Sequence, residues 1–161
     1  MKDSSSSTTT TKTKNLGKKF EDEVYKQFKS HPGVSIDRIP DQTMRYKGRK
    51  NVSDFIVFRR PREYYIECKT VHGNRLPFAN ITQFDALLEK SDIFGVIPGV
   101  LCWWVDKDIT RWIPIDELAY LKSLGNKSVR YDDNVGFKIG GKKRKIFFDY
   151  DLDTFFKNYG N

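Results

Sequence analysis

The strongest constraint on the fold is a pair of short apolar runs that carry ionisable side chains. Residues 54–58 read DFIVF and residues 64–70 read YYIECKT, and runs this rich in β-branched and aromatic residues predict β-strands. Asp54, Glu67 and Lys69 lie within these runs. A charge inside a buried strand is costly unless an opposite charge or an ion compensates it. We therefore expect these three side chains to meet.

The polar turn RRPRE between the two runs predicts how the strands pair. A hairpin centred between Arg60 and Pro61 places Asp54 directly opposite Glu67, with Cβ atoms about 4.5–5.5 Å apart. Two carboxylates at this separation repel each other unless a proton or a cation lies between them. Because side chains alternate along a strand, Lys69 shares the face of Glu67.

These residue types suit a metal site. Carboxylate oxygens are the ligands that Mg²⁺ prefers, with Mn²⁺ as a substitute. Asp54 and Glu67 therefore predict a site for one or two ions, and Lys69 predicts a nearby phosphate. The alternative interpretation is a surface hairpin in which Lys69 forms a salt bridge with a neighbouring acid.

An amphipathic helix is predicted upstream, at about residues 16–30. Its apolar stripe recurs every four residues and consists of Leu16, Phe20, Val24 and Phe28. Glu21 falls at the edge of this stripe, so it is either a third carboxylate directed at the metal site or an ordinary borderline residue of the helix.

A second helix is predicted downstream, at about residues 80–90. Thr82 or Asn80 is expected to cap it, because short polar side chains favour helix N-termini. Gln83 then lies on a different face from the apolar Phe84.

The order of these motifs resembles the metal-dependent PD-(D/E)xK nuclease superfamily, in which an acidic residue is followed by (D/E)-x-K on the next strand. Ser53 stands where the name of the motif has proline. The sequence RIP at residues 38–40 and LPF at residues 76–78 narrow the resemblance to RecU-type Holliday junction resolvases in a compact, bacteriophage-like form. The resemblance covers roughly residues 15–121.

This resemblance implies a restriction-endonuclease-like α/β fold, with a mixed central sheet flanked by helices on both faces. It implies a Mg²⁺-dependent, homodimeric endonuclease that cleaves four-way DNA junctions in recombination and repair. The catalytic positions would be Glu21, Asp54, Glu67 and Lys69, the first three as metal ligands, and Arg38 and Gln83 are further candidates. In place of the family's long stalk before the catalytic aspartate, this chain has only residues 41–52. A restriction or end-processing nuclease, or a non-catalytic basic DNA-binding protein, therefore remain alternatives.

Charge also favours a nucleic-acid partner. The 161-residue chain has a net charge of +8 and a pI of about 9.4, which attracts polyanions. Residues 38–75 hold ten Lys and Arg but only four acids, two of which are the proposed ligands. The predicted DNA contacts in the loop before Asp54 are Arg45, Lys47, Arg49 and Lys50. A C-terminal hairpin of residues 137–139 with 146–150 would add Lys142, Lys143 and Arg144 at its tip.

The chain lacks the residues that characterise several other classes of protein. His31 and His72 stand alone, which argues against zinc and histidine nuclease sites, and no phosphate-binding glycine motif is present. Cys68 and Cys102 lie in apolar, strand-like segments. We therefore expect buried thiols in a reducing compartment and no disulfide between them. With neither a signal peptide nor a membrane span in the sequence, we expect a cytoplasmic protein, in the host cell if a phage encodes it.

The predicted order of elements is that of one α/β domain. A disordered Ser/Thr/Lys tail at residues 1–14 precedes a single nuclease domain at 15–161. Strands are expected near 34–39, 53–59, 64–70, 95–105 and 110–113, with a further helix at 114–123. The apolar segments 100–105 and 147–159 are the two candidates for the dimer interface.

Overall fold

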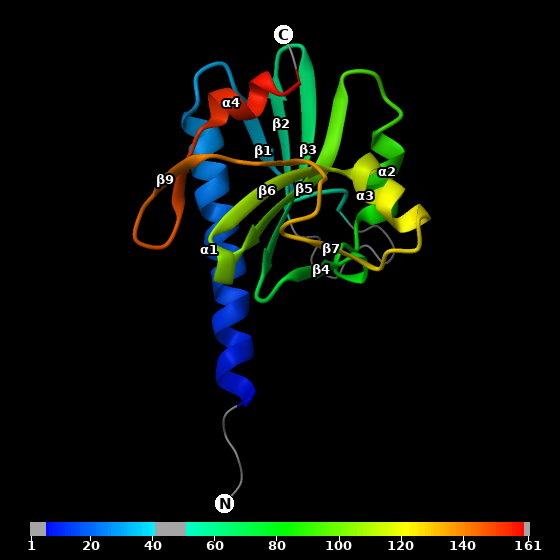
Figure 1. Ribbon diagram of the computed structural model, residues 1–161. Coiled ribbons are helices and arrows are strands. Elements are labelled where there is room, and N and C mark those ends of the chain that lie inside the picture. Colours follow the sequence, from blue (N-terminus) through cyan, green and yellow to red (C-terminus); the bar gives the residue numbers. More distant parts are fainter. Residues whose placement is uncertain (1–5, 41–50, 160–161) are drawn as a thin grey trace, which may run out of the picture.

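The computed structural model describes residues 6–40 and 51–159, with side chains from residue 15 onward. Figure 1 shows a central sheet with helices on both sides. The helices are α1 (Ser6–Ser30), α2 (Phe84–Lys90), α3 (Ile115–Ser123) and α4 (Leu152–Lys157), with short 3₁₀ helices η1 (Phe78–Asn80) and η2 (Val105–Lys107). The strands are β1 (Ser35–Arg38), β2 (Phe55–Arg59), β3 (Arg62–Val71), β4 (Arg75–Pro77), β5 (Val96–Trp104), β6 (Ile109–Pro114), β7 (Ser128–Arg130), β8 (Phe137–Lys138), β9 (Gly141–Lys143) and β10 (Phe148–Tyr150).

The central sheet has six strands in the order β1-β2-β3-β5-β6-β8. β3 and β5 pair in parallel and the other neighbours pair antiparallel. A parallel pair needs a crossover connection, and here the chain crosses through α2. The α/β class and the mixed sheet predicted from the sequence are confirmed.

Side-chain alternation in the sheet divides the interior into two cores. α1 and α4 cover one face, which contains Cys68 and Trp103. α2 and α3 cover the other, which contains Cys102 and Trp104. Both cysteines are buried and unpaired, as predicted. Burial of each large aromatic side chain removes about 150–250 Å² from water, an upper bound of about 4–6 kcal/mol of stabilisation.

Helix α1 packs through the predicted apolar stripe. Phe20, Val24 and Phe28 are buried in the first core, and Leu16 is packed against it. The helix begins at Ser6, however, within the segment assigned to a disordered tail. Its first turns extend beyond the sheet in Figure 1, so they continue the backbone ladder of a helix whose later turns are anchored in the core.

The second predicted helix begins later than expected. α2 starts at Phe84, and Gln83 precedes it without a side-chain capping bond. The prediction that Thr82 or Asn80 caps the helix is therefore wrong. The reason is tertiary: the backbone N–H of Phe78 donates to the carbonyl of Lys127 at 3.0 Å, which fixes residues 78–80 as a separate 3₁₀ turn.

The C-terminal hairpin is also corrected. β10 pairs with β9, which lies inside the predicted tip, whereas β8 pairs with β6 of the central sheet. Ile139 explains the change, because it is buried in the first core and its N–H donates to the carbonyl of Thr110 at 2.9 Å. The run 137–139 is thereby drawn into the sheet and cannot pair with residues 146–150.

Neither apolar segment proposed as a dimer interface is available as a continuous surface. Residues 100–104 form the buried C-terminal half of β5, and Phe155 and Phe156 of α4 are buried against α1 and the sheet. Residues 100–104 therefore serve the core of the monomer, whereas only Leu152, Phe155 and Phe156 do so in segment 147–159, which stays a predicted interface. Among the described residues, no helix is both long and apolar enough to cross a membrane.

Candidate active site

The hairpin of β2 and β3 brings Asp54 and Glu67 together in the predicted register. The last pair of the ladder is Phe55 with Ile66, so the next residues along each strand are Asp54 and Glu67. The backbone N–H of Asp54 donates to the carbonyl of Ile66 at 3.1 Å. Its Oδ2 accepts from the N–H of Cys68 at 2.8 Å. The Asp54 carboxylate is thus fixed against β3.

Glu67 is a buried acid, and only one of its two carboxylate oxygens has a hydrogen-bond partner among the described residues. Its side chain is 2% exposed, and its Oε1 accepts from Lys69 Nζ at 2.7 Å. Its Oε2 is buried and has no hydrogen-bond partner among the described residues. Burial and the nearby Asp54 charge raise the pKa of Glu67 to about 7, against the opposing effect of Lys69. An orphaned buried oxygen is costly and indicates a missing partner.

Helix α1 delivers the third carboxylate. It passes beside the end of β3, where a Cβ built on Gly17 would lie 3.5 Å from Thr70 Oγ1, and Glu21 follows one turn later. Glu21 lies 3.8 Å from Lys18 Nζ. The Glu21 charge also contributes to the raised pKa of Glu67. The four predicted catalytic residues therefore gather at one end of the β2–β3 pair.

A small cavity lies beside Glu21 and Asp54, whereas Glu67 and Lys69 are not among its lining residues. It has a volume of about 50 Å³, and its lining residues are Lys18, Glu21, Arg38, Ile39, Pro40 and Asp54. A water molecule needs about 10–15 Å³ of such space, so the cavity can hold a few waters or a partly hydrated ion. Its location next to two carboxylates and two cations suits an ion and a phosphate oxygen.

The donor set fits Mg²⁺, although the described residues form no ready-made cage. In residues 15–40 and 51–159, no three His, Cys, Asp or Glu side chains are close enough together to hold a metal as they stand. Asp54, Glu67 and Glu21 nevertheless offer the hard oxygens that Mg²⁺ prefers, and Mg²⁺ keeps several waters instead of filling its shell with protein ligands. The unpartnered Oε2 of Glu67 is the observation that favours an ion here.

The two further candidates differ in position. Arg38 forms an ion pair with Asp22 at 2.7 Å, stacks on the rings of Tyr25 and Phe55, and lines the cavity with Glu21. Gln83 accepts a hydrogen bond from the Thr82 hydroxyl at 2.9 Å and is not a lining residue of that cavity. The structure therefore places Arg38 at the site but gives Gln83 no contact with it.

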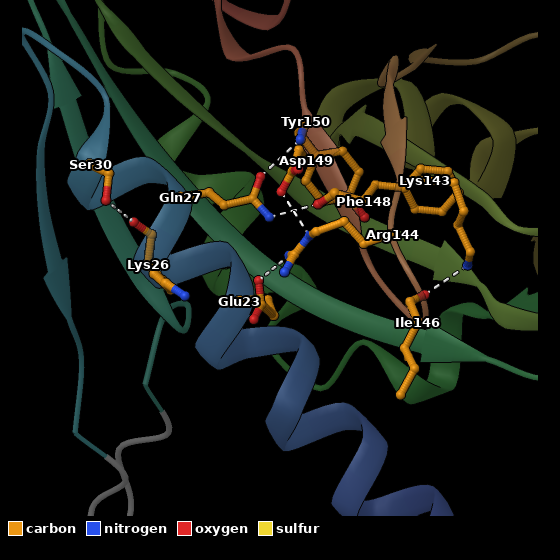
Figure 2. Close-up of polar contacts among 10 residues, drawn as sticks. All are labelled: Glu23, Lys26, Gln27, Ser30, Lys143, Arg144, Ile146, Phe148, Asp149 and Tyr150. Carbon is orange, nitrogen blue, oxygen red and sulfur yellow. Dashed lines mark hydrogen bonds and ion pairs between the residues drawn. The ribbon is translucent and has the colours of Figure 1, made fainter.

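Of the predicted DNA contacts, Arg45, Lys47, Arg49 and Lys50 lie outside the described residues. Figure 2 shows that Arg144 points toward Glu23 of α1. Arg144 forms ion pairs with Glu23 and Asp149, and Lys143 forms one with Asp108 at 2.8 Å. Only Lys142 of the three forms no ion pair within the described part of the chain. Two of the three cations thus attach the hairpin to the body of the protein.

Helix α1 holds this hairpin through two residues that the sequence analysis did not select. Gln27 donates to the carbonyl of Phe148 at 2.7 Å and accepts from the N–H of Tyr150 at 2.9 Å (Figure 2). Glu23 pairs with Arg144 one turn earlier. Glu23 and Gln27 are four residues apart, and this spacing could have predicted that they share one face of the helix. Nothing in the local sequence indicated which strand that face would contact.

A larger cavity lies away from these residues. It has a volume of about 430 Å³ between η1, the start of α2 and the end of α3, with Phe78, Phe84, Lys122 and Lys127 among its lining residues. None of the four predicted catalytic residues lines it. This cavity is therefore separate from the predicted catalytic residues.

No protein-family model matches the chain, and no curated protein matches it. Among solved structures, the chain is similar to Hjc of Archaeoglobus fulgidus, a Holliday junction resolvase from an archaeal hyperthermophile, determined at 1.6 Å resolution. The similarity has 15% sequence identity and a TM-score of 0.45, and covers 63% of this chain and 75% of that chain. A likeness at this level is too weak to establish a shared activity.

Proposed function

We propose that the protein is a metal-dependent DNA endonuclease that cleaves branched DNA, with the four-way junction as its substrate. One observation carries the proposal. Glu67 is buried beside Asp54, with one oxygen held by Lys69 and the other without a partner. This arrangement is costly for the fold, and a site that is costly for the fold is a candidate for function.

The chain's own residues have distinct parts in this chemistry. Asp54, Glu67 and Glu21 would hold Mg²⁺, which when bound polarises a phosphate and lowers the pKa of a coordinated water. The N–H of Cys68 orients the Asp54 carboxylate. Lys69 holds Glu67 in place and presents an ammonium to the phosphate, where it can stabilise charge that develops as the bond breaks.

The choice of DNA as substrate rests on charge. The net charge of +8 favours a polyanion, and basic residues are concentrated on both sides of Asp54 in the sequence. The choice of a branched substrate rests on the family resemblance. Paired nicks in two strands would need two active sites, so we further propose a homodimer with two-fold symmetry that matches the junction.

The direct experiment compares a four-way junction, a flap and a linear duplex of matched sequence, each with Mg²⁺, Mn²⁺, Ca²⁺ or EDTA. We expect cleavage of the junction with Mg²⁺ or Mn²⁺, and binding without cleavage in Ca²⁺. Full activity after exhaustive chelation would exclude the metal mechanism. Cutting of linear duplex at defined sequences would indicate a restriction-type enzyme, and binding without any cleavage would indicate a non-catalytic DNA-binding protein.

A further inference from the structure

A buried serine lies immediately before the proposed metal ligand. Ser53 is 1% exposed and is one of only three buried polar residues in the described part of the chain, with Glu67 and Thr110. Its hydroxyl donates to the carbonyl of Phe55 at 2.9 Å. A buried hydroxyl is tolerated when it is hydrogen-bonded, and this particular bond spans Asp54.

The position of Asp54 in the strand makes this bond important. β2 begins at Phe55, so Asp54 lies just outside the regular ladder. Its backbone is held instead by single contacts, because its N–H donates to Ile66 and its carbonyl accepts from Ile39 at 2.9 Å. The Ser53–Phe55 bond closes a ring that contains the backbone of Asp54, and it thereby restricts the backbone dihedrals of Asp54. Those dihedrals decide where the carboxylate points.

We infer that Ser53 is a positioning residue for Asp54. It acts through the backbone of Asp54, holding the carboxylate where it can share an ion with Glu67, and has no contact with substrate. The inference rests on the proposed function. Residues that orient a metal ligand from outside the ligand set typically affect metal affinity or activity by about 10- to 100-fold when they are replaced.

Thr110 provides a matched control. It is also a buried hydroxyl, 2% exposed, and its Oγ1 is 2.7 Å from the hydroxyl of Tyr150. It lies on β6, which β3 and β5 separate from β2 in the sheet. Loss of its hydroxyl should therefore lower stability in the same way, without affecting Asp54.

The experiment measures Mn²⁺ binding to the DNA-free protein by titration calorimetry, together with thermal unfolding in EDTA and junction cleavage. Ser53→Ala should weaken Mn²⁺ binding by about 10- to 100-fold, and Ser53→Thr, which keeps the hydroxyl, should restore it. Thr110→Val should lower the unfolding temperature but bind Mn²⁺ like the wild type. If Ser53→Ala does not fold, Ser53→Cys makes the same comparison, since a thiol is a weak donor of similar size.

The outcomes separate the two claims. If the wild type binds Mn²⁺ and cleaves the junction while Ser53→Ala binds Mn²⁺ equally well, the inference about Ser53 is wrong and the proposed function stands. Equal losses of affinity in Ser53→Ala and Thr110→Val would also overturn it, because they would reflect general destabilisation. A wild type that neither binds Mn²⁺ nor cleaves DNA would overturn the proposed function and this inference with it.

Discussion

Replacement of Lys69 by methionine tests the ion pair at the centre of the site. The change keeps a long aliphatic side chain but removes the ammonium that lies 2.7 Å from Glu67 Oε1. Glu67 is 2% exposed and Lys69 is 23% exposed, so water can solvate the lysine but not the carboxylate. The variant therefore leaves a buried charge beside Asp54 without its partner, which is destabilising.

Protonation of Glu67 sets a ceiling on this loss. Burial already raises its pKa to about 7, and removal of Lys69 raises that pKa further until the carboxyl is neutral. At about pH 8.5 the solution is about 1.5 pH units above the wild-type pKa of Glu67. Each unit adds about 1.4 kcal/mol to the free energy of protonating the carboxyl. We therefore expect Lys69→Met to lower the free energy of unfolding by up to about 2 kcal/mol. The loss should shrink to well under about 1 kcal/mol as the pH falls to about 7, where about half of the wild-type carboxyls bind a proton, and should vanish below that pH.

The assay is a double-mutant cycle in metal-free buffer with EDTA. Urea unfolding can be followed by the fluorescence of Trp103, Trp104 and Trp112, all of which are buried. In the background of Glu67→Gln, Lys69→Met should be nearly neutral, because no carboxylate remains to be neutralised. The coupling energy at about pH 8.5 should then approach about 2 kcal/mol.

Two results would refute this reasoning. If Lys69→Met costs the same in both backgrounds, within about 0.5 kcal/mol at about pH 8.5, the ion pair does not form in solution. If the loss in the wild-type background persists unchanged at about pH 7, it reflects the packing of the lysine side chain and not its charge.

Further predictions concern activity, DNA binding and assembly. Asp54→Asn, Glu67→Gln and Lys69→Ala should each slow junction cleavage by about 10²-fold or more but leave gel-shift binding in Ca²⁺ unchanged; wild-type rates in all three would contradict the site. Alanine replacement of Arg45, Lys47, Arg49 and Lys50 should lower the slope of the logarithm of the binding constant against the logarithm of the salt concentration by up to about four units. An unchanged slope would mean that the DNA lies elsewhere. Arg144→Ala should speed hydrogen exchange at the N–H of Tyr150, since the hairpin loses its ion pair to Glu23 of α1 and the internal pair between Arg144 and Asp149; unchanged exchange would mean that Gln27 suffices. Sedimentation should show a dimer at micromolar concentration, and a strict monomer with and without junction DNA would exclude paired nicking by one assembly.

Local sequence patterns determined the centre of the site. Richness in β-branched and aromatic residues defined the runs that became β2 and β3, and the short polar turn between them fixed their register. Asp54 was therefore placed opposite Glu67 before any tertiary contact was known. The stripe of α1 followed in the same way from a repeat near 3.6 residues. Both patterns are local, so residues close in the sequence suffice to specify them.

The tertiary structure decided which residues far apart in the sequence join these elements. Packing of α1 beside β3 brought Glu21 to the site, and the sequence had left that role open. Burial of Ile139 in the first core moved β8 into the central sheet, and this changed the partner of β10. Lys143 and Arg144 became structural cations because Asp108 and Glu23 lie opposite them. Such pairings depend on competition between distant apolar and charged groups for one partner, and no local periodicity records the outcome of that competition.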